Sequence, residues 1–508
     1  MSALASHDYL VIGSGSAGAV VARRLVDAGA DVGLIEAGGP DTNPAIHDPA
    51  RWPELSESAD DWALLTDPQE ALGGRRLSWP RGKVLGGTSA MNGMAYIRGH
   101  PLDYDGWAYH GCPGWSFEDV LPLFKRSEDF DAGESEFHGS GGPMRVTTLY
   151  EPHPLIAGMV AASQEAGIPF NADHNGATLD GVGYTQLITR DGRRETAATS
   201  FLAPVMENEN LTVYTHANVR RLRFSGRRCS GVDVALDGDA QVIEASVEVV
   251  VCAGAIGSPK LLMLSGIGPA GELGRLGIDS VADLPGVGAN LHDHLLSPVI
   301  FSSPKPIPPA LPGLSQLHGH LFWRSRPGLV VPDTQPLCFH MPLYREAGEG
   351  PPEAYTILGG LIRPDSRGAL RLRSANPDDP LSLDPRCLTC DSDLEALTAS
   401  VELSRDIGRE PGLNEWTREE LFPGPGVRTH DELREYVRQT AASYHHQVGT
   451  CKMGSDADAV VDPELRVVGV EGLRVADASV MPFISSGNTH APTTMIGEKA
   501  SDLLLGRG

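Results

Sequence analysis

Three histidines near the end of the sequence are the residues best suited to proton transfer. His445 and His446 are neighbours in the segment SYHHQVGTCKMG, and His490 lies in the segment SSGNTHAPTTMIGEKA. A neutral imidazole can take a proton from a hydroxyl group near neutral pH. In an extended chain, adjacent side chains point to opposite faces. We therefore expect only one of the two adjacent histidines to face a reaction centre.

The segment GSGSAG near the N-terminus predicts a phosphate-binding turn. It places Gly13, Gly15 and Gly18 in a GxGxxG pattern between an apolar strand-like run and a helical run. Such glycines permit a tight turn, a close approach of the backbone to a pyrophosphate, and close packing of helix on strand. Glu36 ends the next predicted strand, where a carboxylate can accept hydrogen bonds from a ribose. The pattern predicts a dinucleotide, NAD or FAD. Further contacts are expected at Ser16, Ala17 and Ala37.

The composition is that of a large globular protein with an excess of acidic groups. The 508 residues are 41% hydrophobic and 21% charged, and the formal net charge is −25. This charge argues against binding to nucleic acid, which needs clustered Lys and Arg, and against binding to an anionic membrane surface. The seven cysteines are scattered, which does not suggest a disulfide framework. Cys387 and Cys390 form a CxxC without a second ligand pair, so no metal site is predicted.

The N-terminal segment MSALASHDYLVIGSG leads directly into the first predicted strand. It has neither the basic start nor the long apolar stretch of a secretion signal. No apolar run in the sequence is long enough to span a bilayer. We therefore expect a cytoplasmic protein without a membrane span.

The predicted elements form an α/β protein in which both ends of the chain contribute to a parallel layer. Residues 8–37 read as strand, helix and strand, and residues 248–269 repeat the order of strand, glycine turn and helix. Alternating apolar and polar residues at 352–385 predict antiparallel strands. Helical spacing is found at 156–167, 391–408, 431–443 and 491–505.

Four segments resemble the signatures of a known family. They are RGKVLGGTSAMNGMAYIRGHPLDYD (Arg81 to Asp105), GAIGSPKLLMLSGIG (Gly254 to Gly268), HQVGTCKMG and NTHAPTTMIGEKA. In content, order and spacing they are similar to the glucose–methanol–choline (GMC) oxidoreductases. The resemblance implies a Rossmann-like FAD-binding domain with an interleaved substrate domain built on an antiparallel sheet. The FAD-binding domain would comprise residues 1–155, 190–300 and 440–508, and the substrate domain residues 156–189 and 301–439.

The resemblance also implies how the cofactor is held. The glycine-rich GKVLGGTSAMNG can place backbone N–H groups along a pyrophosphate and a flavin edge without obstruction by side chains. Val219 resembles the family's backbone contact to adenine, and Asp477 the residue beside the ribityl and pyrophosphate groups. Met91 stands where some relatives carry a histidine bonded to the flavin, so non-covalent FAD is expected. The implied contacts are Arg81, Gly86, Gly87, Asn92, Gly93, Met94, Val219, Ala253, Asp477, Ala478, Thr489 and Ala491.

The family pattern H-x-x-G-T distinguishes the two adjacent histidines. Counting back from Gly449-Thr450 gives His446, so His445 is expected to face away. His490 falls where relatives carry either Asn or His. The resemblance implies alcohol oxidation, in which a hydride passes to flavin N5 while His446 takes the hydroxyl proton as general base. His490 would hydrogen-bond the alcohol oxygen.

The favoured reaction is oxidation of a primary alcohol to the aldehyde, with oxygen or another electron acceptor. An aromatic or heterocyclic substrate, such as pyridoxine or a furfuryl or benzyl alcohol, suits the ring-bearing residues expected near the site at 302–345. These residues are Trp323, Phe339, His340 and Tyr344. Two alternatives stay open: a choline or alkanol dehydrogenase that uses an acceptor other than oxygen, and a hydroxynitrile lyase that keeps FAD without net redox chemistry.

Overall fold

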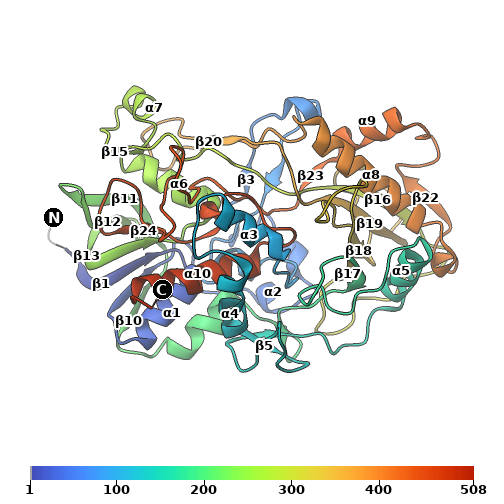
Figure 1. The fold of residues 1–508 in the computed structure, drawn as a ribbon, viewed down its shortest axis with the longest axis horizontal. Helices are drawn as coiled ribbons and strands as arrows, with labels where there is room; N and C mark the ends of the chain where they lie inside the picture. Colours follow the sequence, from blue (N-terminus) through green and yellow to red (C-terminus); the bar gives the residue numbers. More distant parts are fainter. Residues whose placement is uncertain (1–2, 508) are drawn as a thin grey trace.

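The computed structural model describes residues 3–507 and contains two large sheets at opposite ends of an elongated molecule (Figure 1). The first sheet has the order β10-β2-β1-β13-β12-β11, and β24 also pairs with β13. Strands β10, β2, β1, β13 and β24 run parallel, and β12 and β11 add an antiparallel edge. The bounds are β1 (Ala5–Ile12), β2 (Val32–Ile35), β10 (Leu211–Tyr214), β11 (Ala217–Ser225), β12 (Arg228–Leu236), β13 (Asp239–Val251) and β24 (Leu473–Val475).

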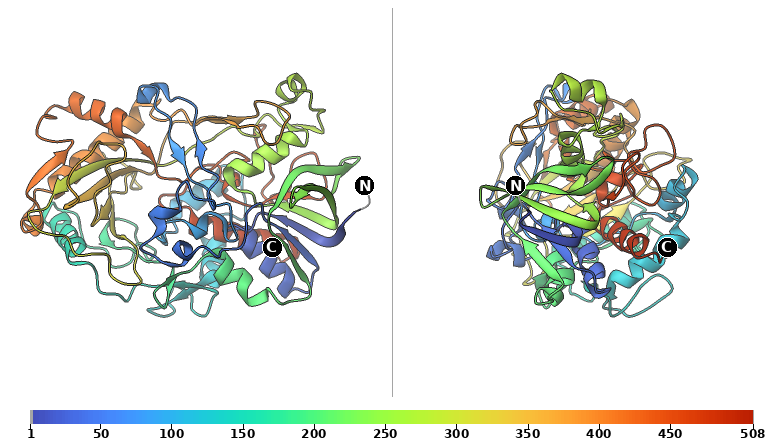
Figure 2. Two further views of the ribbon diagram at one scale, coloured as in Figure 1. Left: turned by 180° about the vertical axis from the view of Figure 1, so that it is seen from behind. Right: turned by 90° about the vertical axis from the view of Figure 1, so that its left-hand side faces the viewer.

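Two helices from opposite ends of the chain lie side by side against this sheet (Figures 1 and 2). Helix α1 (Gly18–Asp27) follows β1, and α10 (His490–Leu504) is the C-terminal helix. A Cβ on Gly497 would lie 2.8 Å from the Ala17 carbonyl oxygen, so the helices approach closely because this residue is glycine. This packing brings the first residue of α10, His490, to the glycine turn that precedes α1.

The second sheet is antiparallel throughout, in the order β22-β16-β19-β18-β17-β7, with β23 paired to β16. Helix α8 (Asp391–Ile407) packs on β19 and β16. A Cβ on Gly359 would lie 2.9 Å from Val401 Cγ2, so this glycine permits the close approach of helix and strand. The bounds are β7 (Gly181–Tyr184), β16 (Leu295–Ser302), β17 (Leu317–Phe322), β18 (Leu337–Phe339), β19 (Ala354–Leu361), β22 (Glu419–Phe422) and β23 (Ala442–Ser443).

Shorter elements connect and cover the two sheets. The remaining helices are α2 (Pro44–His47), α3 (Pro101–Tyr109), α4 (Phe117–Ser127), α5 (Pro154–Glu165), α6 (Gly254–Leu264), α7 (Ala270–Arg275) and α9 (His430–Thr440). The small strand pairs are β3 (Leu64–Leu65) with β4 (Ser78–Trp79), β5 (Glu128–Phe130) with β6 (Met144–Val146), β8 (Thr189–Arg190) with β9 (Arg193–Arg194), β14 (Ile267–Gly268) with β15 (Ala282–Asp283), and β20 (Ala369–Arg371) with β21 (Ser382–Asp384).

The predicted parallel layer from both ends of the chain and the predicted antiparallel middle are confirmed. The helices predicted within residues 8–37 and 248–269 are α1 and α6, and the four predicted from helical spacing are α5, α8, α9 and α10. In the second sheet, β16 starts at Leu295 and so crosses the domain boundary predicted at residue 300, and β23 (Ala442–Ser443) lies within the segment 440–508 predicted for the FAD-binding domain. The apolar run LLSPVIFS carries no turn signal at the point where the chain enters the second sheet.

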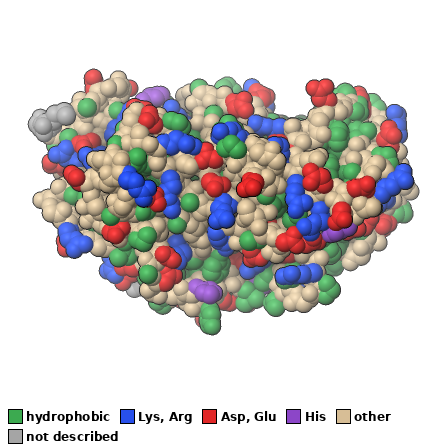
Figure 3. Space-filling view, turned by 90° about the horizontal axis from the view of Figure 1, so that it is seen from above, with side chains coloured by type: hydrophobic (Ala, Val, Ile, Leu, Met, Phe, Trp, Pro, Cys, Tyr) green, Lys and Arg blue, Asp and Glu red, His purple; other side chains and the backbone are tan. Residues whose placement is uncertain are grey.

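The described part of the chain, residues 3–507, contains no helix with the length and apolar character needed to cross a bilayer. Within the same residues, no group of three or more His, Cys, Asp and Glu side chains is arranged to hold a metal ion. Acidic and basic side chains are mixed over the face seen in Figure 3.

Candidate active site

A cavity of about 810 Å³ is lined by residues from both sheets. At one end its wall consists of the glycine turn after β1, the start of α6, and Val219 on β11. At the other end the wall consists of strands β16 to β19 and the segment around β23. His446, which follows β23, and His490, the first residue of α10, both line this cavity.

The glycine turn has the geometry that its sequence predicts. Gly13 has φ +98, and a Cβ there would lie 2.5 Å from the Cys252 carbonyl oxygen. A Cβ on Gly18 would lie 1.9 Å from the Gly13 carbonyl oxygen, so helix α1 can start here only with glycine. Gly15 lines the cavity, and the nearest atom to a Cβ there would be 3.9 Å away. The turn therefore presents bare backbone to the cavity at Gly15.

Two buried carboxylates shape the same end of the cavity. Glu36 accepts hydrogen bonds from the Ser14 hydroxyl at 2.7 Å and from the Gly38 N–H at 2.9 Å. Asp477 accepts hydrogen bonds from the Gly254 N–H at 2.9 Å and from the Ser258 hydroxyl at 2.5 Å. Burial raises the pKa of both carboxyl groups, and these hydrogen bonds oppose the rise. Both carboxylates thus fix the backbone that surrounds the cavity.

His446 is held on both ring nitrogens. Its Nδ1 lies 2.9 Å from His294 Nδ1, and its Nε2 lies 3.3 Å from the side-chain nitrogen of Asn488. An amide nitrogen can only donate, so Nε2 accepts from Asn488, and the ring proton is on Nδ1, where it is donated to His294. Burial, with His294 as a further cause, lowers the pKa of His446 well below its usual value. The side chain is therefore a neutral imidazole with its lone pair on Nε2.

His490 is the first residue of α10 and contacts the glycine turn. Its Nδ1 lies 2.7 Å from the Ser16 hydroxyl oxygen. Its Nε2 is buried and has no hydrogen-bond partner within the protein, although the side chain lines the cavity. Burial lowers the pKa of His490 to about 4. A second neutral imidazole with an unused ring nitrogen thus faces the cavity.

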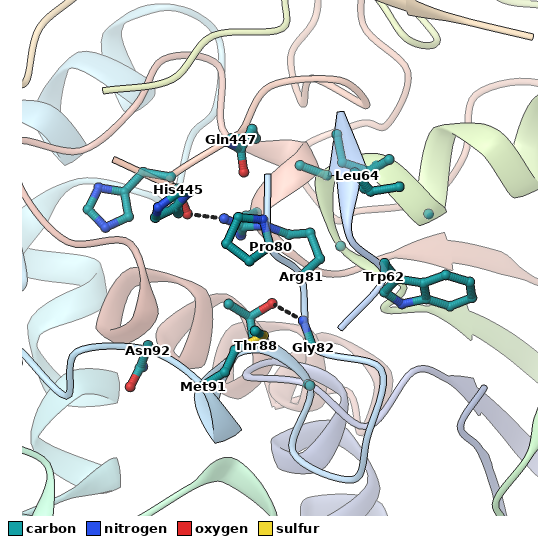
Figure 4. Close-up of a pocket in the computed structure, with 18 of the residues that line it drawn as sticks. Trp62, Leu64, Pro80, Arg81, Gly82, Thr88, Met91, Asn92, His445 and Gln447 are labelled. Atoms are coloured by element: carbon teal, nitrogen blue, oxygen red, sulfur yellow. Dashed lines mark hydrogen bonds between the residues drawn. The ribbon is translucent and has the colours of Figure 1, made fainter. Parts of the chain in front are cut away.

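The expectation that His445 faces away from the site is wrong. His445 has φ +65, in the left-handed region, so the strand-like alternation of side chains is interrupted between it and His446. Both side chains line the cavity. Figure 4 shows His445 beside Pro80 and Arg81, whose guanidinium donates a hydrogen bond to the His445 carbonyl oxygen.

Three site residues were not predicted from the sequence: Asp293, His294 and Asn488. Asp293 accepts hydrogen bonds from the His446 N–H at 2.7 Å, the Gln447 amide at 2.7 Å and the Ser443 hydroxyl. It therefore holds the turn that carries the adjacent histidines. The polar run HDH at residues 292–294, immediately before an apolar strand, is the signal in the sequence that marks two of them.

A buried arginine orients Asn92. Arg194 donates to the Asn92 side-chain oxygen at 2.8 Å and also to the Asn92 carbonyl oxygen. The same side-chain oxygen accepts from the Met94 N–H at 3.0 Å. Burial lowers the pKa of Arg194 to about 9. The Asn92 amide oxygen is thus fully used, and its NH₂ group is free to donate into the cavity.

Most of the predicted cofactor contacts line the cavity, and three do not. Gly18 packs α1 on its own turn, Gly86 has φ +92 in the turn before Gly87, and Ala491 is buried in α10. The predicted contacts that line the cavity are Gly13, Gly15, Ser16, Ala17, Glu36, Ala37, Arg81, Gly87, Asn92, Gly93, Met94, Val219, Ala253, Asp477, Ala478 and Thr489. Met91 also lines it and offers no nucleophilic nitrogen.

Comparison with known protein families identifies the family to which this chain belongs. Residues 7–296 match the N-terminal model of the GMC oxidoreductases, and residues 364–497 match the C-terminal model. The chain belongs to the GMC oxidoreductase family. The predicted family and the predicted FAD dependence are confirmed.

Relatives of this GMC oxidoreductase include enzymes that act on alcohols. The human mitochondrial choline dehydrogenase is 40% identical, over 99% of this chain and 90% of that protein. The oxygen-dependent choline dehydrogenase of Brucella ovis is 39% identical, over 98% of this chain and 96% of that protein. The crystal structure of pyridoxine 4-oxidase from Mesorbium loti is similar with a TM-score of 0.94 at 36% identity, covering 97% of this chain and 98% of that chain. Formate oxidase from Aspergillus oryzae gives a TM-score of 0.92 at 25% identity, over 100% of this chain and 99% of that chain.

The residues of this GMC oxidoreductase fit FAD. Bare backbone at Gly15 suits a pyrophosphate, Glu36 lies where a ribose can bind, and the free NH₂ of Asn92 suits a flavin edge. The unpaired Nε2 of His490 remains for a substrate hydroxyl, and the lone pair of His446 Nε2 becomes available when the substrate replaces the Asn488 amide. FAD supplies the hydride acceptor for alcohol oxidation, and the chain supplies binding, orientation and proton transfer.

The substrate end of the cavity is mainly apolar. Its lining includes side chains of the small hydrophobic cluster between the second sheet and the site: Trp52, Leu296, Leu317, Leu337, Phe339, Leu343, Leu358 and Tyr444. Of the four ring-bearing residues expected here, Phe339 lines the cavity. Trp323, His340 and Tyr344 do not line the cavity; the His340 ring packs against His318, and the Tyr344 ring packs against Phe422.

Proposed function

We propose that this enzyme oxidises an uncharged primary alcohol with an aromatic or heterocyclic group to the aldehyde, with His446 as general base. The observation that carries the proposal is the apolar, aromatic lining beside two neutral histidines. A flat ring gains free energy from burial against Leu, Phe and Trp side chains. Its hydroxymethyl group can then reach the ring nitrogens of His446 and His490.

The proton of the substrate hydroxyl group has a defined acceptor. The lone pair on His446 Nε2 can accept the substrate O–H when the substrate hydroxyl replaces the Asn488 amide, which lies 3.3 Å away, and His294 keeps the ring in that orientation through Nδ1. The Nε2 of His490, unpaired in the protein, can hydrogen-bond the same oxygen and support its developing negative charge. The alcohol loses one proton to His446 and one hydride to the cofactor, which balances oxidation to the aldehyde.

The carboxylates that line the cavity already have partners, which favours an uncharged substrate. Among the described residues, five line the cavity, and each is already engaged: Glu36 and Asp477 by backbone and hydroxyl donors, Glu346 by Arg75, Asp378 by Arg220, and Asp379 by Ser374 and Asn376. A quaternary ammonium group gains most from an unpaired carboxylate or an aromatic cage. The substrate end offers no unpaired carboxylate among these five.

Anaerobic reduction of the flavin tests the proposal. The purified holoenzyme would be mixed with benzyl alcohol, hydroxymethylfurfural, pyridoxine, choline and linear alkanols while the visible flavin band is followed. We expect an aromatic or heterocyclic alcohol to bleach the flavin most efficiently. Admission of air then separates an oxidase, which recovers rapidly, from a dehydrogenase. Bleaching by choline or alkanols alone would contradict the proposed substrate class. Cleavage of an added cyanohydrin, mandelonitrile, to benzaldehyde and cyanide without bleaching would support a lyase.

Choline is the second candidate. The choline dehydrogenases are 39–40% identical over nearly the whole chain. Trp52, Phe339 and Tyr444 place aromatic faces at the substrate end, and aromatic faces attract quaternary ammonium groups. The same panel compares choline directly with its uncharged isostere 3,3-dimethylbutan-1-ol. A preference for the charged alcohol would favour this candidate.

A further inference from the structure

His445 is a second histidine that the fold turns into the substrate cavity. Its positive φ of +65 is uncommon for a residue with a side chain, and such conformations are kept where the surrounding structure enforces them. Here the enforcement comes from Asp293, which binds Ser443, the His446 N–H and Gln447 on both sides of His445. The turn therefore places two consecutive imidazoles on one cavity wall.

The backbone of His445 is fixed, whereas its ring is free of partners. The N–H donates to the Ser443 hydroxyl oxygen at 2.9 Å, and the carbonyl oxygen accepts from Arg81. The ring Nδ1 is buried and has no hydrogen-bond partner in the protein. His446, by contrast, uses both ring nitrogens within the protein. A buried polar atom without a partner is unfavourable, and a ligand group that hydrogen-bonds it removes this penalty.

The surroundings of His445 differ from those of His446. Arg345 and Glu346 also line the cavity, and Arg345 is one of the charges that act on His445. Burial is the main cause that lowers the pKa of His445 to about 3, so its ring is neutral and offers one donor and one acceptor. The largely apolar substrate end thus includes a buried His445 Nδ1 without a partner, as well as the Tyr444 hydroxyl and Trp52 Nε1. Of these atoms, His445 Nδ1 belongs to the residue next to the base His446.

We propose, building on the proposed function, that His445 is a substrate-recognition residue that hydrogen-bonds a hydroxyl group on the substrate's aromatic ring. The substrate class is accordingly a hydroxylated aromatic or heteroaromatic primary alcohol. His446 acts on the hydroxymethyl group, and His445 binds the second hydroxyl group at the other edge of the ring. The role is recognition and not proton transfer, because His446 has the fixed tautomer that a base needs.

Two substitutions of His445 separate the effect of losing the imidazole ring from the effect of changing the backbone conformation. Glycine and asparagine both tolerate positive φ, so neither His445→Gly nor His445→Asn strains the turn. Asparagine keeps a hydrogen-bonding group near the place of Nδ1, and glycine removes it. FAD content and the flavin absorption spectrum of each variant report whether the cofactor site is intact.

The experiment is anaerobic rapid mixing of the holoenzymes with benzyl alcohol and with its 2-, 3- and 4-hydroxy derivatives. For the native enzyme we expect one hydroxy isomer to bind about ten-fold more tightly than benzyl alcohol, as judged by the concentration that half-saturates flavin reduction. His445→Gly should abolish this preference, His445→Asn should retain part of it, and the limiting rate with benzyl alcohol should stay within about three-fold in both.

The other outcomes distinguish failure of the proposed function from failure of the proposed role of His445. If no aromatic alcohol reduces the native flavin, the proposed function fails. If benzyl alcohol reduces it but no hydroxy isomer is preferred, or if the preference persists in His445→Gly, recognition by His445 fails. Loss of benzyl alcohol oxidation in His445→Gly with FAD still bound would make His445 a proton-transfer residue and would also overturn the inference.

Discussion

Two turns border the same cavity and reach a positive φ in different ways. At the cofactor end, Gly13 has φ +98 and the turn carries no large side chain toward the cavity. At the substrate end, His445 has φ +65 and the turn carries two consecutive imidazoles. Backbone N–H groups are sufficient to bind a phosphate, whereas proton transfer needs a titratable side chain. The second turn therefore carries the proposed base, His446, directly after the residue with positive φ, whereas the first turn presents backbone alone.

The supports of the two turns also differ. The glycine turn needs space, because added Cβ atoms at Gly13 and Gly18 would collide with backbone oxygens. The histidine turn needs partners, because Asp293 binds groups on both sides of His445. The first turn is sensitive to added volume, and the second is sensitive to lost hydrogen bonds.

The largest expected effect separates chemistry from cofactor binding. His446→Ala removes the general base, and we expect the rate of flavin reduction by alcohol to fall by about 100- to 10,000-fold. FAD should stay bound, because the cofactor end of the cavity is unchanged. Stopped-flow absorbance with the best alcohol gives the rate, and the bound flavin spectrum is the control. A rate close to that of the native enzyme would show that the base lies elsewhere.

Two glycine variants test whether the first turn is limited by space. In Gly18→Ala the Cβ would lie 1.9 Å from the Gly13 oxygen, so we expect a loss of about 1–3 kcal/mol in the free energy of unfolding of the apoprotein. In Gly15→Ala the nearest atom is 3.9 Å away, so the apoprotein should keep its stability and FAD should bind more weakly. Urea unfolding of the apoprotein and titration with FAD measure the two effects. Equal destabilisation of the apoprotein by both variants would contradict the assignment of Gly18 to packing and of Gly15 to FAD binding.

An isosteric change tests whether the second turn depends on its carboxylate. Asp293→Asn leaves one oxygen for the three donors that the two carboxylate oxygens bind, which are the His446 N–H, the Gln447 amide and the Ser443 hydroxyl. The NH₂ group then faces at least one of these donors, and we expect flavin reduction to slow by about ten-fold while FAD remains bound. Ser443→Ala, which removes one donor to the same carboxylate, should have a smaller effect. A native rate in Asp293→Asn would show that other contacts hold the turn.

The smallest expected effect concerns the second sheet, which buries further histidines away from the reaction. His318 on β17 is buried, and burial is the main cause that lowers its pKa to about 3. The unfolded chain binds a proton at this residue below about pH 6.5, whereas the folded chain does not. Its contribution to stability is therefore present above that pH and is lost as the pH falls toward 3.

We expect His318→Gln to remove this pH dependence. Between pH 7.5 and 5.5 the native protein should lose about 1.4 kcal/mol more stability than the variant. Urea unfolding of both proteins at the two pH values gives the difference. Parallel losses in the two proteins would show that His318 titrates alike in the folded and unfolded states.

The sequence by itself determined the features that depend on local conformation and on the spacing of residues within one motif. The GxGxxG turn and Glu36 at the end of β2 follow from neighbouring residues, and the choice of His446 follows from the resemblance of its segment to the family pattern H-x-x-G-T. The helices and strands that carry them also follow from hydrophobic periodicity. These features need no knowledge of distant parts of the chain.

Only the tertiary structure decided how the histidines are used. The rule of alternating side chains failed at His445, because a positive φ at a non-glycine residue has no local sequence signal. That conformation is enforced by Asp293, which is 153 positions away from the His446 N–H that it binds. The tautomer of His446 likewise depends on His294, 152 positions away. Contacts of this kind form only when the two sheets fold around one cavity, and for that reason no pattern within a single segment could reveal them.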